Sequence, residues 1–244
     1  MEKFWNERTE LLLDKEKLET LKNSHVLLCG LGGVGGAAAE MVARSGVGEM
    51  TLVDADIVEA SNRNRQLAAL VSSNGKKKTE VIAQRLRDIN PAIKLNLIDS
   101  YVDQFCIKDL IGTHYDFAID AIDTLIPKIE LVAHLYENNI RFVSSMGAGG
   151  KIDPSKTHIA DISQSYNCRL AKMLRKRLGR RGIRTGFPVV FSTEQIDKTK
   201  LIITDGNNNK KSVIGTISYM PNIFGCCCAS VAIRTLINEK IDGI

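Results

Sequence analysis

The stretch that decides the fold is His25-Val26-Leu27-Leu28-Cys29-Gly30-Leu31-Gly32-Gly33-Val34-Gly35. An apolar run of strand length ends at the first glycine, and a helical pattern begins among the later ones, so the sequence predicts a strand, a tight turn and a helix in succession. Gly30, Gly32, Gly33 and Gly35 allow the backbone to turn tightly and to approach a phosphate. The helix N-terminus beyond them offers unpaired N–H groups and partial positive charge, so the stretch predicts a nucleotide-binding turn.

Strand and helix patterns alternate after this turn. We expect strands at 25–29, 50–53, 94–98, 116–120 and 141–145, and helices at 34–45, 76–88 and 127–138. This alternation predicts the α/β class, with a doubly wound, mostly parallel, Rossmann-like sheet.

We expect a single domain over 1–244, divided into three parts. Residues 1–24 form an N-terminal amphipathic helix, 25–154 a nucleotide-binding core, and 155–244 a C-terminal elaboration that faces the substrate. The elaboration is predicted to hold a basic helix, strands at 189–192 and 201–204, a polar turn at 205–211, and an apolar helix at about 224–238.

Polar residues that suit a nucleoside triphosphate follow the predicted strands. Asp54 ends the second strand nineteen residues after Gly35, where a carboxylate accepts hydrogen bonds from ribose hydroxyls. Arg65 and Lys78 follow, and Asp123 comes just after the strand at 116–120. Cations that neutralise phosphates and a carboxylate that holds Mg²⁺ fit ATP better than a hydride-transfer cofactor. An NAD-binding or non-catalytic Rossmann protein remains the alternative of a different class.

A basic segment stands out against the rest of the chain. Residues 169–184 hold eight Lys and Arg and no acid, whereas the other 25 of the 33 basic residues are outnumbered by 28 Asp and Glu. Leu170, Leu174 and Leu178 recur at helical spacing, which predicts a helix with its cations directed outward. Such a helix suits a polyanion. The alternative is a solvated helix whose arginine stems cover the sheet.

Cysteine spacing and hydropathy argue against a structural zinc site and against a membrane or secreted protein. None of the six cysteines forms a C-x-x-C pair, so we expect no structural zinc, and Cys226-Cys227-Cys228 read as buried small apolar residues. The sequence shows no signal peptide and no apolar run long enough to span a membrane, so a reducing cytoplasmic location is predicted.

Taken together, these motifs resemble the ubiquitin-activating-enzyme-like adenylyltransferases. The matching segments are Gly30–Gly35, Val53-Asp54, Ser61-Asn62-x-x-Arg65-Gln66, Lys78 and Ile122-Asp123. Within that superfamily the chain is most similar to the tRNA threonylcarbamoyladenosine dehydratases, through residues 120–124, 147–154, and the basic stretch before 190–193.

The resemblance implies roles for these residues. Asp54 would bind the ATP ribose, the glycine turn with Asn62, Arg65, Gln66 and Lys78 would surround the phosphates, and Asp123 would hold Mg²⁺. Arg8 would reach the ATP of the partner subunit in a homodimer, although Thr9 and Asp14 replace the usual Gln and Gly of that segment. The cations implied to contact tRNA are Arg169, Lys172, Arg175, Lys176, Arg180 and Arg181.

The implied reaction is adenylation of the threonylcarbamoyl carboxylate of a modified adenosine beside the tRNA anticodon, followed by ring closure. Adenylation of a sulfur-carrier protein's C-terminus is the alternative within the superfamily. No cysteine matches the catalytic one of some relatives: Lys210 stands near its expected position, and Cys168 is a remote candidate. A monovalent cation at the carbonyls of Gly147–Gly150 is a further expectation.

Overall fold

A seven-stranded sheet forms the centre of the computed structural model, which describes residues 5–103, 106–107, 110, 112–196, 201–203 and 212–241. The strand order is β3-β2-β1-β4-β5-β7-β6. The strands span β1 His25–Cys29, β2 Glu49–Val53, β3 Lys94–Ile98, β4 Phe117–Asp120, β5 Phe142–Ser145, β6 Thr157–Asp161 and β7 Pro188–Ser192. Neighbouring strands pair in parallel, except that β6 runs antiparallel to β7. The predicted α/β, doubly wound, mostly parallel sheet is confirmed.

The order of the strands reverses at β1. The chain builds β2 and β3 outward on one side of β1, and then returns to place β4, β5 and β7 on the other side. In open α/β sheets, ligands bind at the carboxyl ends of the strands beside such a reversal. The glycine turn follows β1 and residues 121–124 follow β4, so both lie at this point.

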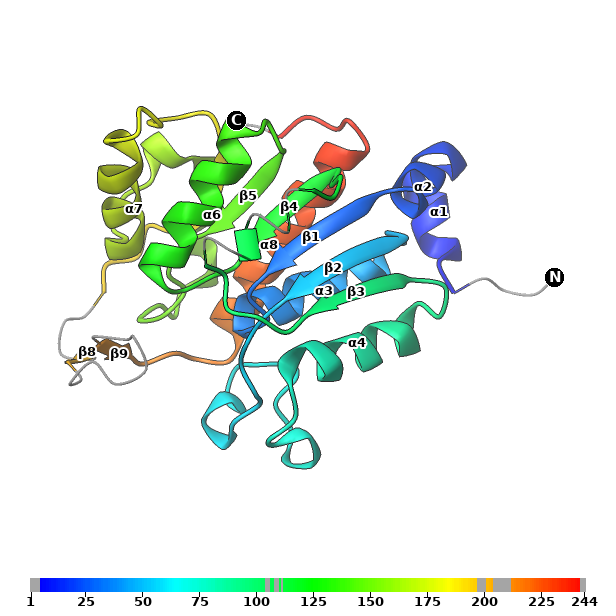
Figure 1. The fold of residues 1–244 in the computed structure, drawn as a ribbon, viewed down its shortest axis with the longest axis horizontal. Coiled ribbons are helices and arrows are strands. Elements are labelled where there is room, and N and C mark those ends of the chain that lie inside the picture. The colour runs from blue at the N-terminus through cyan, green and yellow to red at the C-terminus, as the bar shows by residue number, and fades with distance from the viewer. Residues whose placement is uncertain are drawn as a thin grey trace.

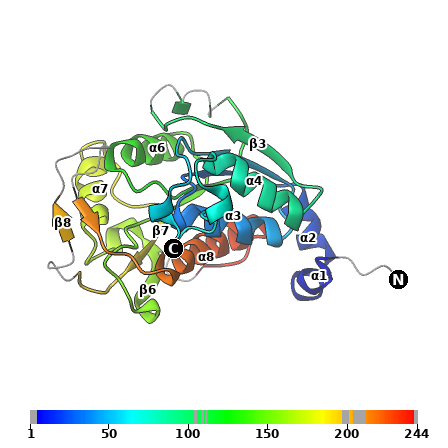
Figure 2. The same ribbon diagram turned by 90° about the horizontal axis from the view of Figure 1, so that it is seen from below.

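Helices cover both faces of the sheet (Figures 1 and 2). The helices α3 (Gly33–Arg44), α4 (Lys78–Ile89) and α8 (Tyr219–Leu236) share one face, whereas α6 (Leu125–Glu137) and α7 (Arg169–Gly179) lie on the other. Successive strand residues point to opposite faces. Val26 and Leu28 accordingly enter the core beneath α3 and α8, and Leu27 and Cys29 enter the core beneath α6.

The N-terminal segment is two helices where one was predicted. The first, α1, spans Glu7–Leu13 and the second, α2, spans Lys15–Lys22. Asp14 separates them with φ +69°, and its carboxylate accepts a hydrogen bond from Lys17 N at 3.0 Å. An Asx side chain that caps the next helix competes with a continuous helical backbone, which explains the break.

The C-terminal part also differs from the sequence-based expectation. The edge strand β6 was not predicted, because its side chains are mostly half-exposed and lack a clear apolar alternation. The helix α8 begins at Tyr219, earlier than the predicted 224. Strands β8 (Leu201–Ile203) and β9 (Ser212–Ile214) form an antiparallel pair, and the predicted polar turn at 205–211 falls outside the described residues. Among the described helices, none has both the length and the apolarity needed to cross a membrane.

The packing of α3 on α8 generates a stability prediction. A Cβ built on Gly225 of α8 would lie 2.4 Å from Val34 O and 2.9 Å from Ala38 N, which are backbone atoms that cannot move aside. We expect Gly225→Ala to lower the free energy of unfolding by about 1–3 kcal/mol in urea denaturation, because overpacking outweighs the better helix propensity of alanine.

Gly179→Ala is the matched control, since a Cβ at this end of α7 would meet no atom within 4 Å. Its stability should be unchanged or slightly higher. Equal stability of the Gly225→Ala protein and the wild type would contradict the packing argument.

Candidate active site

The turn between β1 and α3 is the centre of the candidate site. Gly30 has φ +91°, in the left-handed region, and its N–H donates to Val53 O at 2.8 Å. A Cβ on Gly35 would lie only 1.7 Å from Gly30 O, so position 35 admits no side chain in this turn. Gly32 is the N-cap of α3 and provides no side-chain cap. The first N–H groups of the helix are therefore available to an anion.

Asp54 is hydrogen-bonded to the glycine turn. Its Oδ2 accepts from Leu31 N at 2.5 Å and its Oδ1 accepts from Asp56 N at 2.8 Å. The side chain is largely buried, and this burial raises the pKa of Asp54, while the charge of Lys78 acts in the opposite direction. The two backbone donors fix the carboxylate beside the turn, in the place where the Rossmann fingerprint puts a ribose-binding acid.

Residues 62–66 form the side of the site that faces the glycine turn. Asn62 is buried, and its Oδ1 accepts a hydrogen bond from Glu59 N at 3.2 Å. The carbonyl oxygen of Arg65 lies 3.2 Å from the Cβ position of Gly33, so this backbone packs on the start of α3. The Arg65 guanidinium donates to Ser61 O at 3.0 Å.

Gln66 carries an unsatisfied acceptor at the same place. Its Oε1 is buried and has no hydrogen-bond partner within the described structure. Its Nε2 lies 3.9 Å from the position that a Cβ on Gly32 would occupy. A buried amide oxygen without a partner costs free energy, so a ligand that donates a hydrogen bond to Gln66 would be stabilised there.

Lys78 stands at the start of α4 and is 4% exposed. Its Nζ contacts Asp56 Oδ2 at 2.7 Å, and the Asp56 side chain is itself 70% exposed. The lysine is thus held near the site by a partner that water reaches readily. A phosphate that replaced the Asp56 carboxylate would leave a well-solvated acid behind.

Asp123 belongs to the turn after β4, which contacts the glycine turn at Ala121 and Ile122. Cys29 and Asp120 are paired across β1 and β4, and Ala121 N donates to Cys29 O at 2.9 Å. A Cβ on Gly30 would approach Ala121 O to 2.9 Å, so the two turns are in contact. The Asp123 side chain is exposed and accepts a hydrogen bond from the Thr124 hydroxyl at 3.3 Å.

The donor set at Asp123 suits a metal bound together with a nucleotide. Among the residues described, no three His, Cys, Asp or Glu side chains are grouped to hold a metal ion. Mg²⁺ is commonly bound by one or two carboxylates, with substrate phosphates and water completing the coordination. One exposed carboxylate at the end of β4, next to a phosphate-binding turn, fits that pattern.

A buried ion pair below this turn was missed by the sequence analysis. Lys128 Nζ lies 2.6 Å from Asp120 Oδ2, and both side chains are fully buried. The Ser144 hydroxyl donates to the same oxygen at 2.6 Å, and Ile122 N donates to Asp120 Oδ1 at 3.1 Å. The pair therefore fixes the turn that carries Asp123. A strand-end acid followed eight residues later by a lysine in an apolar helix was the available signal.

The structure does not bring Arg8 to this cluster within one chain. The α1–α2 pair packs at the end of α3 remote from the glycine turn, where Leu18 and Asn6 approach Gly46 (Figure 1). The twelve residues of α3 separate the two ends by about 18 Å, given the helical rise per residue. Arg8 is exposed on α1, so it does not contribute to the site of its own chain.

The predicted basic helix is α7, and the structure divides its cations into two groups. Arg175 donates to the carbonyl and hydroxyl oxygens of Ser165, and Arg181 contacts Glu130 at 2.5 Å, so these two side chains have partners within the chain. The other candidate tRNA contacts are exposed, namely Arg169, Lys172, Lys176 and Arg180.

The three consecutive cysteines, Cys226–Cys228, were predicted to be buried, and the structure buries them only in part. Cys228 is fully buried, and burial raises the pKa of its thiol, whereas Cys226 is exposed. Cys168 is the N-cap of α7, and its sulfur accepts from Ala171 N at 3.5 Å, which is a structural role. Lys210 lies outside the described residues.

Comparisons with known proteins place this chain among relatives that it matches over most of its length. tRNA threonylcarbamoyladenosine dehydratase of Bacillus subtilis (strain 168) is 43% identical over 239 residues, which cover 95% of this chain and 94% of that protein. The crystal structure of the Escherichia coli tRNA N6-threonylcarbamoyladenosine dehydratase in complex with ATP has a TM-score of 0.85 and 33% identity, and covers 95% of this chain and 93% of that one. Molybdopterin-synthase adenylyltransferase of E. coli is 35% identical over 131 residues, or 54% of this chain and 52% of that protein.

The sequence pattern of the ThiF family matches residues 7–243. The match spans the glycine turn, the Asp54 and Asp123 positions and the basic helix. The resemblance inferred from the motifs is confirmed, and the chain belongs to the ThiF family.

Proposed function

We propose that this chain is an ATP-dependent tRNA threonylcarbamoyladenosine dehydratase. The observation that carries the proposal is that its similarity to dehydratases extends over almost the whole chain, including the basic helix α7. The molybdopterin relative, by contrast, matches about half of it. Convergence of the glycine turn, Asp54 and Asp123 at one edge of the sheet supports binding of ATP at that edge.

The proposed reaction has two steps. The threonyl carboxylate of the modified adenosine attacks the α-phosphorus of ATP, and pyrophosphate leaves. The carbamoyl group of the same nucleoside then attacks the activated carbonyl carbon, AMP leaves with the bonding electrons, and a proton is released. The net change in the nucleoside is loss of water and closure of a ring. Both reacting groups belong to one nucleoside, so ring closure is an intramolecular reaction that is fast once the two groups are held together. No protein nucleophile is required.

Each residue has a part in this scheme. Asp54 orients the ribose of ATP, and the N–H groups at the start of α3 receive the phosphates. Arg65 and Lys78 stabilise the charge that develops on the leaving pyrophosphate, and Asp123 would hold Mg²⁺. Bound Mg²⁺ would neutralise phosphate charge.

Adenylation of a sulfur-carrier protein is the second candidate within the family. The absence of C-x-x-C pairs from the sequence and the eight cations of residues 169–184 favour a polyanionic substrate instead. An NAD-dependent function has less support, because the cations at 65 and 78 suit a triphosphate. A cytoplasmic location remains a prediction. A monovalent cation taken from solution at Gly147–Gly150 has less support, because the ammonium group of the adjacent Lys151 already contacts carbonyl oxygens there.

Pyrophosphate exchange distinguishes these candidates. We expect ATP–pyrophosphate exchange with tRNA that carries threonylcarbamoyladenosine, and none with tRNA lacking it, with a small ubiquitin-like protein, or with no acceptor. Exchange that depends on the ubiquitin-like protein would assign the chain to the second candidate.

The metal assignment predicts a severe loss in Asp123→Asn. This change removes a charged ligand at similar volume, and we expect tRNA-dependent AMP formation to fall by about a hundredfold or more. Asp88→Asn, on the exposed side of α4, is the matched control and should retain activity. Near wild-type turnover of Asp123→Asn at saturating Mg²⁺ would refute the assignment.

The position of Arg8 predicts complementation between subunits of a homodimer. Arg8→Ala and Lys78→Met should each be inactive alone. In a mixed dimer, one site combines an intact Lys78 with the partner's intact Arg8. Random exchange should therefore restore about a quarter of wild-type activity in a symmetric dimer.

The control for this experiment is subunit exchange between two preparations of Lys78→Met, which should remain inactive. A monomeric wild type in sedimentation equilibrium, or no recovery despite proven exchange, would exclude the action of Arg8 across an interface.

The exposed cations of α7 predict a salt-sensitive interaction with tRNA. Replacement of Lys172, Lys176 and Arg180 by Gln should weaken tRNA binding and reduce the slope of log affinity against log salt by roughly two to three, because fewer counterions are released. ATP binding should be unchanged.

The control is Arg87→Gln with Lys94→Gln, which removes exposed cations from α4 and β3, on the opposite side of the molecule from α7 (Figure 1). An unchanged salt slope in the α7 variant would show that this helix does not contact the RNA backbone.

A further inference from the structure

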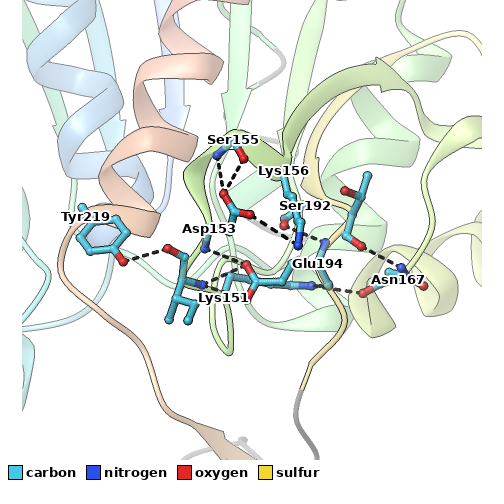
Figure 3. A network of polar contacts seen from close by, with 10 residues as sticks. Lys151, Asp153, Ser155, Lys156, Asn167, Ser192, Glu194 and Tyr219 are labelled. Carbon is cyan, nitrogen blue, oxygen red and sulfur yellow. Dashed lines mark hydrogen bonds and ion pairs between the residues drawn. The ribbon is translucent and has the colours of Figure 1, made fainter.

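A buried lysine occupies the junction between the loop after β5 and the segment after β7. Lys151 follows Gly150 and is 1% exposed. Figure 3 shows its side chain extended among segments that are far apart in the sequence. Burial lowers the pKa of Lys151 from that of an ordinary lysine, while the Glu194 carboxylate nearby opposes this effect. None of the chemistry proposed above uses this ammonium group.

The ammonium group is held by main-chain oxygens. Its Nζ donates to the carbonyl oxygen of Glu194 and contacts that of Asn167 at 3.4 Å. The Glu194 carboxylate does not bind the ammonium group in return. It accepts instead from Ile152 N at 3.0 Å and from Asp153 N at 2.8 Å. The Lys151 side chain thus binds the main chain of Glu194, and the Glu194 side chain binds the main chain of the two residues after Lys151. We call this reciprocal arrangement the 151–194 clasp.

The 151–194 clasp joins further segments through neighbouring residues. Asn167 has φ +53°, and its Nδ2 donates to Thr193 O at 2.8 Å. The Tyr219 hydroxyl, at the start of α8, donates to Ile152 O at 2.8 Å. Because Asn167 immediately precedes the N-cap of α7, the clasp sets where the basic helix begins relative to the carboxyl end of β5.

Backbone carbonyl oxygens are the ligands that proteins use for K⁺, and two of them, those of Asn167 and Glu194, contact the Lys151 ammonium group. An ammonium group carries the same charge, is similar in size to K⁺, and donates to the same oxygens. A buried charge is costly unless it is compensated, and the carbonyl oxygens of Asn167 and Glu194 supply that compensation to Lys151.

We propose that the Lys151 ammonium is a built-in monovalent cation, which fills a carbonyl-lined position between Asn167 and Glu194 and so fixes the start of α7 without K⁺ or Na⁺ from solution. In this view, Lys151 is a positioning residue. Removal of its side chain would leave a cation site that free K⁺ or NH₄⁺ can enter.

Thermal unfolding in matched chloride salts tests the proposal without reference to activity. Wild type should unfold at the same temperature in KCl and in choline chloride of equal ionic strength. Lys151→Ala should be less stable in choline and should regain stability in KCl or NH₄Cl, because an ion that binds only the folded state stabilises it. Lys151→Gln serves as a second variant if Lys151→Ala does not fold.

Lys151→Met is the matched control, because its unbranched apolar side chain takes up most of the volume of lysine without its charge. Its stability should be lower than that of wild type and equal in the two salts. K⁺-specific stabilisation of the wild type would overturn the proposal. The proposal would also fail if Lys151→Ala were no more stable in KCl than in choline, and Lys151→Gln likewise.

A second readout rests on the proposed function. In choline, Lys151→Ala should raise the KM for tRNA by about tenfold, because a small displacement of α7 misplaces its tRNA contacts. The KM for ATP should be unchanged, and K⁺ should reverse the increase. Salt-dependent stability without any tRNA-dependent reaction in the wild type would support the built-in cation and refute the dehydratase function instead.

Discussion

The close contact between two backbone turns is the constraint on which the rest of the site depends. The turn after β1 and the turn after β4 touch at Gly30 and Ala121, at a separation that excludes a side chain on the glycine. Parallel pairing of β1 with β4 brings the two turns to one edge of the sheet. From that contact, Leu31 N reaches the carboxylate of Asp54 and the second turn places Asp123 nearby. A side chain at position 30 or 35 would separate the groups that the proposed chemistry needs together.

Local patterns in the sequence were sufficient for the central sheet and the glycine turn, because strand and helix periodicities and glycine turns are short-range signals. They were not sufficient where a single residue or a distant pair decides the structure. Asp14 ends a helix whose apolar pattern continues through it, and β6 is an edge strand with little alternation. The pairing of Lys128 with Asp120 and that of Lys151 with Glu194 depend on which segments the sheet places side by side, and a lysine normally indicates an exposed position.

The three buried lysines differ in how deeply their partners are buried, and this difference separates their roles. Lys78, Lys128 and Lys151 are each at most 4% exposed and each has a partner within the chain, but the partners differ. The partner of Lys128 is the fully buried Asp120, whose charge would be left uncompensated if the lysine turned to a ligand. The partner of Lys78 is the largely exposed Asp56, which water can solvate. Of these three lysines, Lys78 alone can exchange its partner for a phosphate at low cost.

The proposed chemistry also requires that the start of α7 keep a fixed position relative to the glycine turn. Attack of a carboxylate on a phosphorus atom is fast only when both are held within contact distance, and small displacements are costly. In the proposed scheme, the glycine turn holds the nucleotide at the ends of β1 and β4, whereas α7 begins after β6 on the far side of β5 and β7. The sheet alone leaves the start of α7 free to vary, since Asn167 belongs to no strand. In the proposed arrangement, Lys151 and Glu194 limit that freedom, so the buried cation supports the site together with the residues proposed to contact the nucleotide.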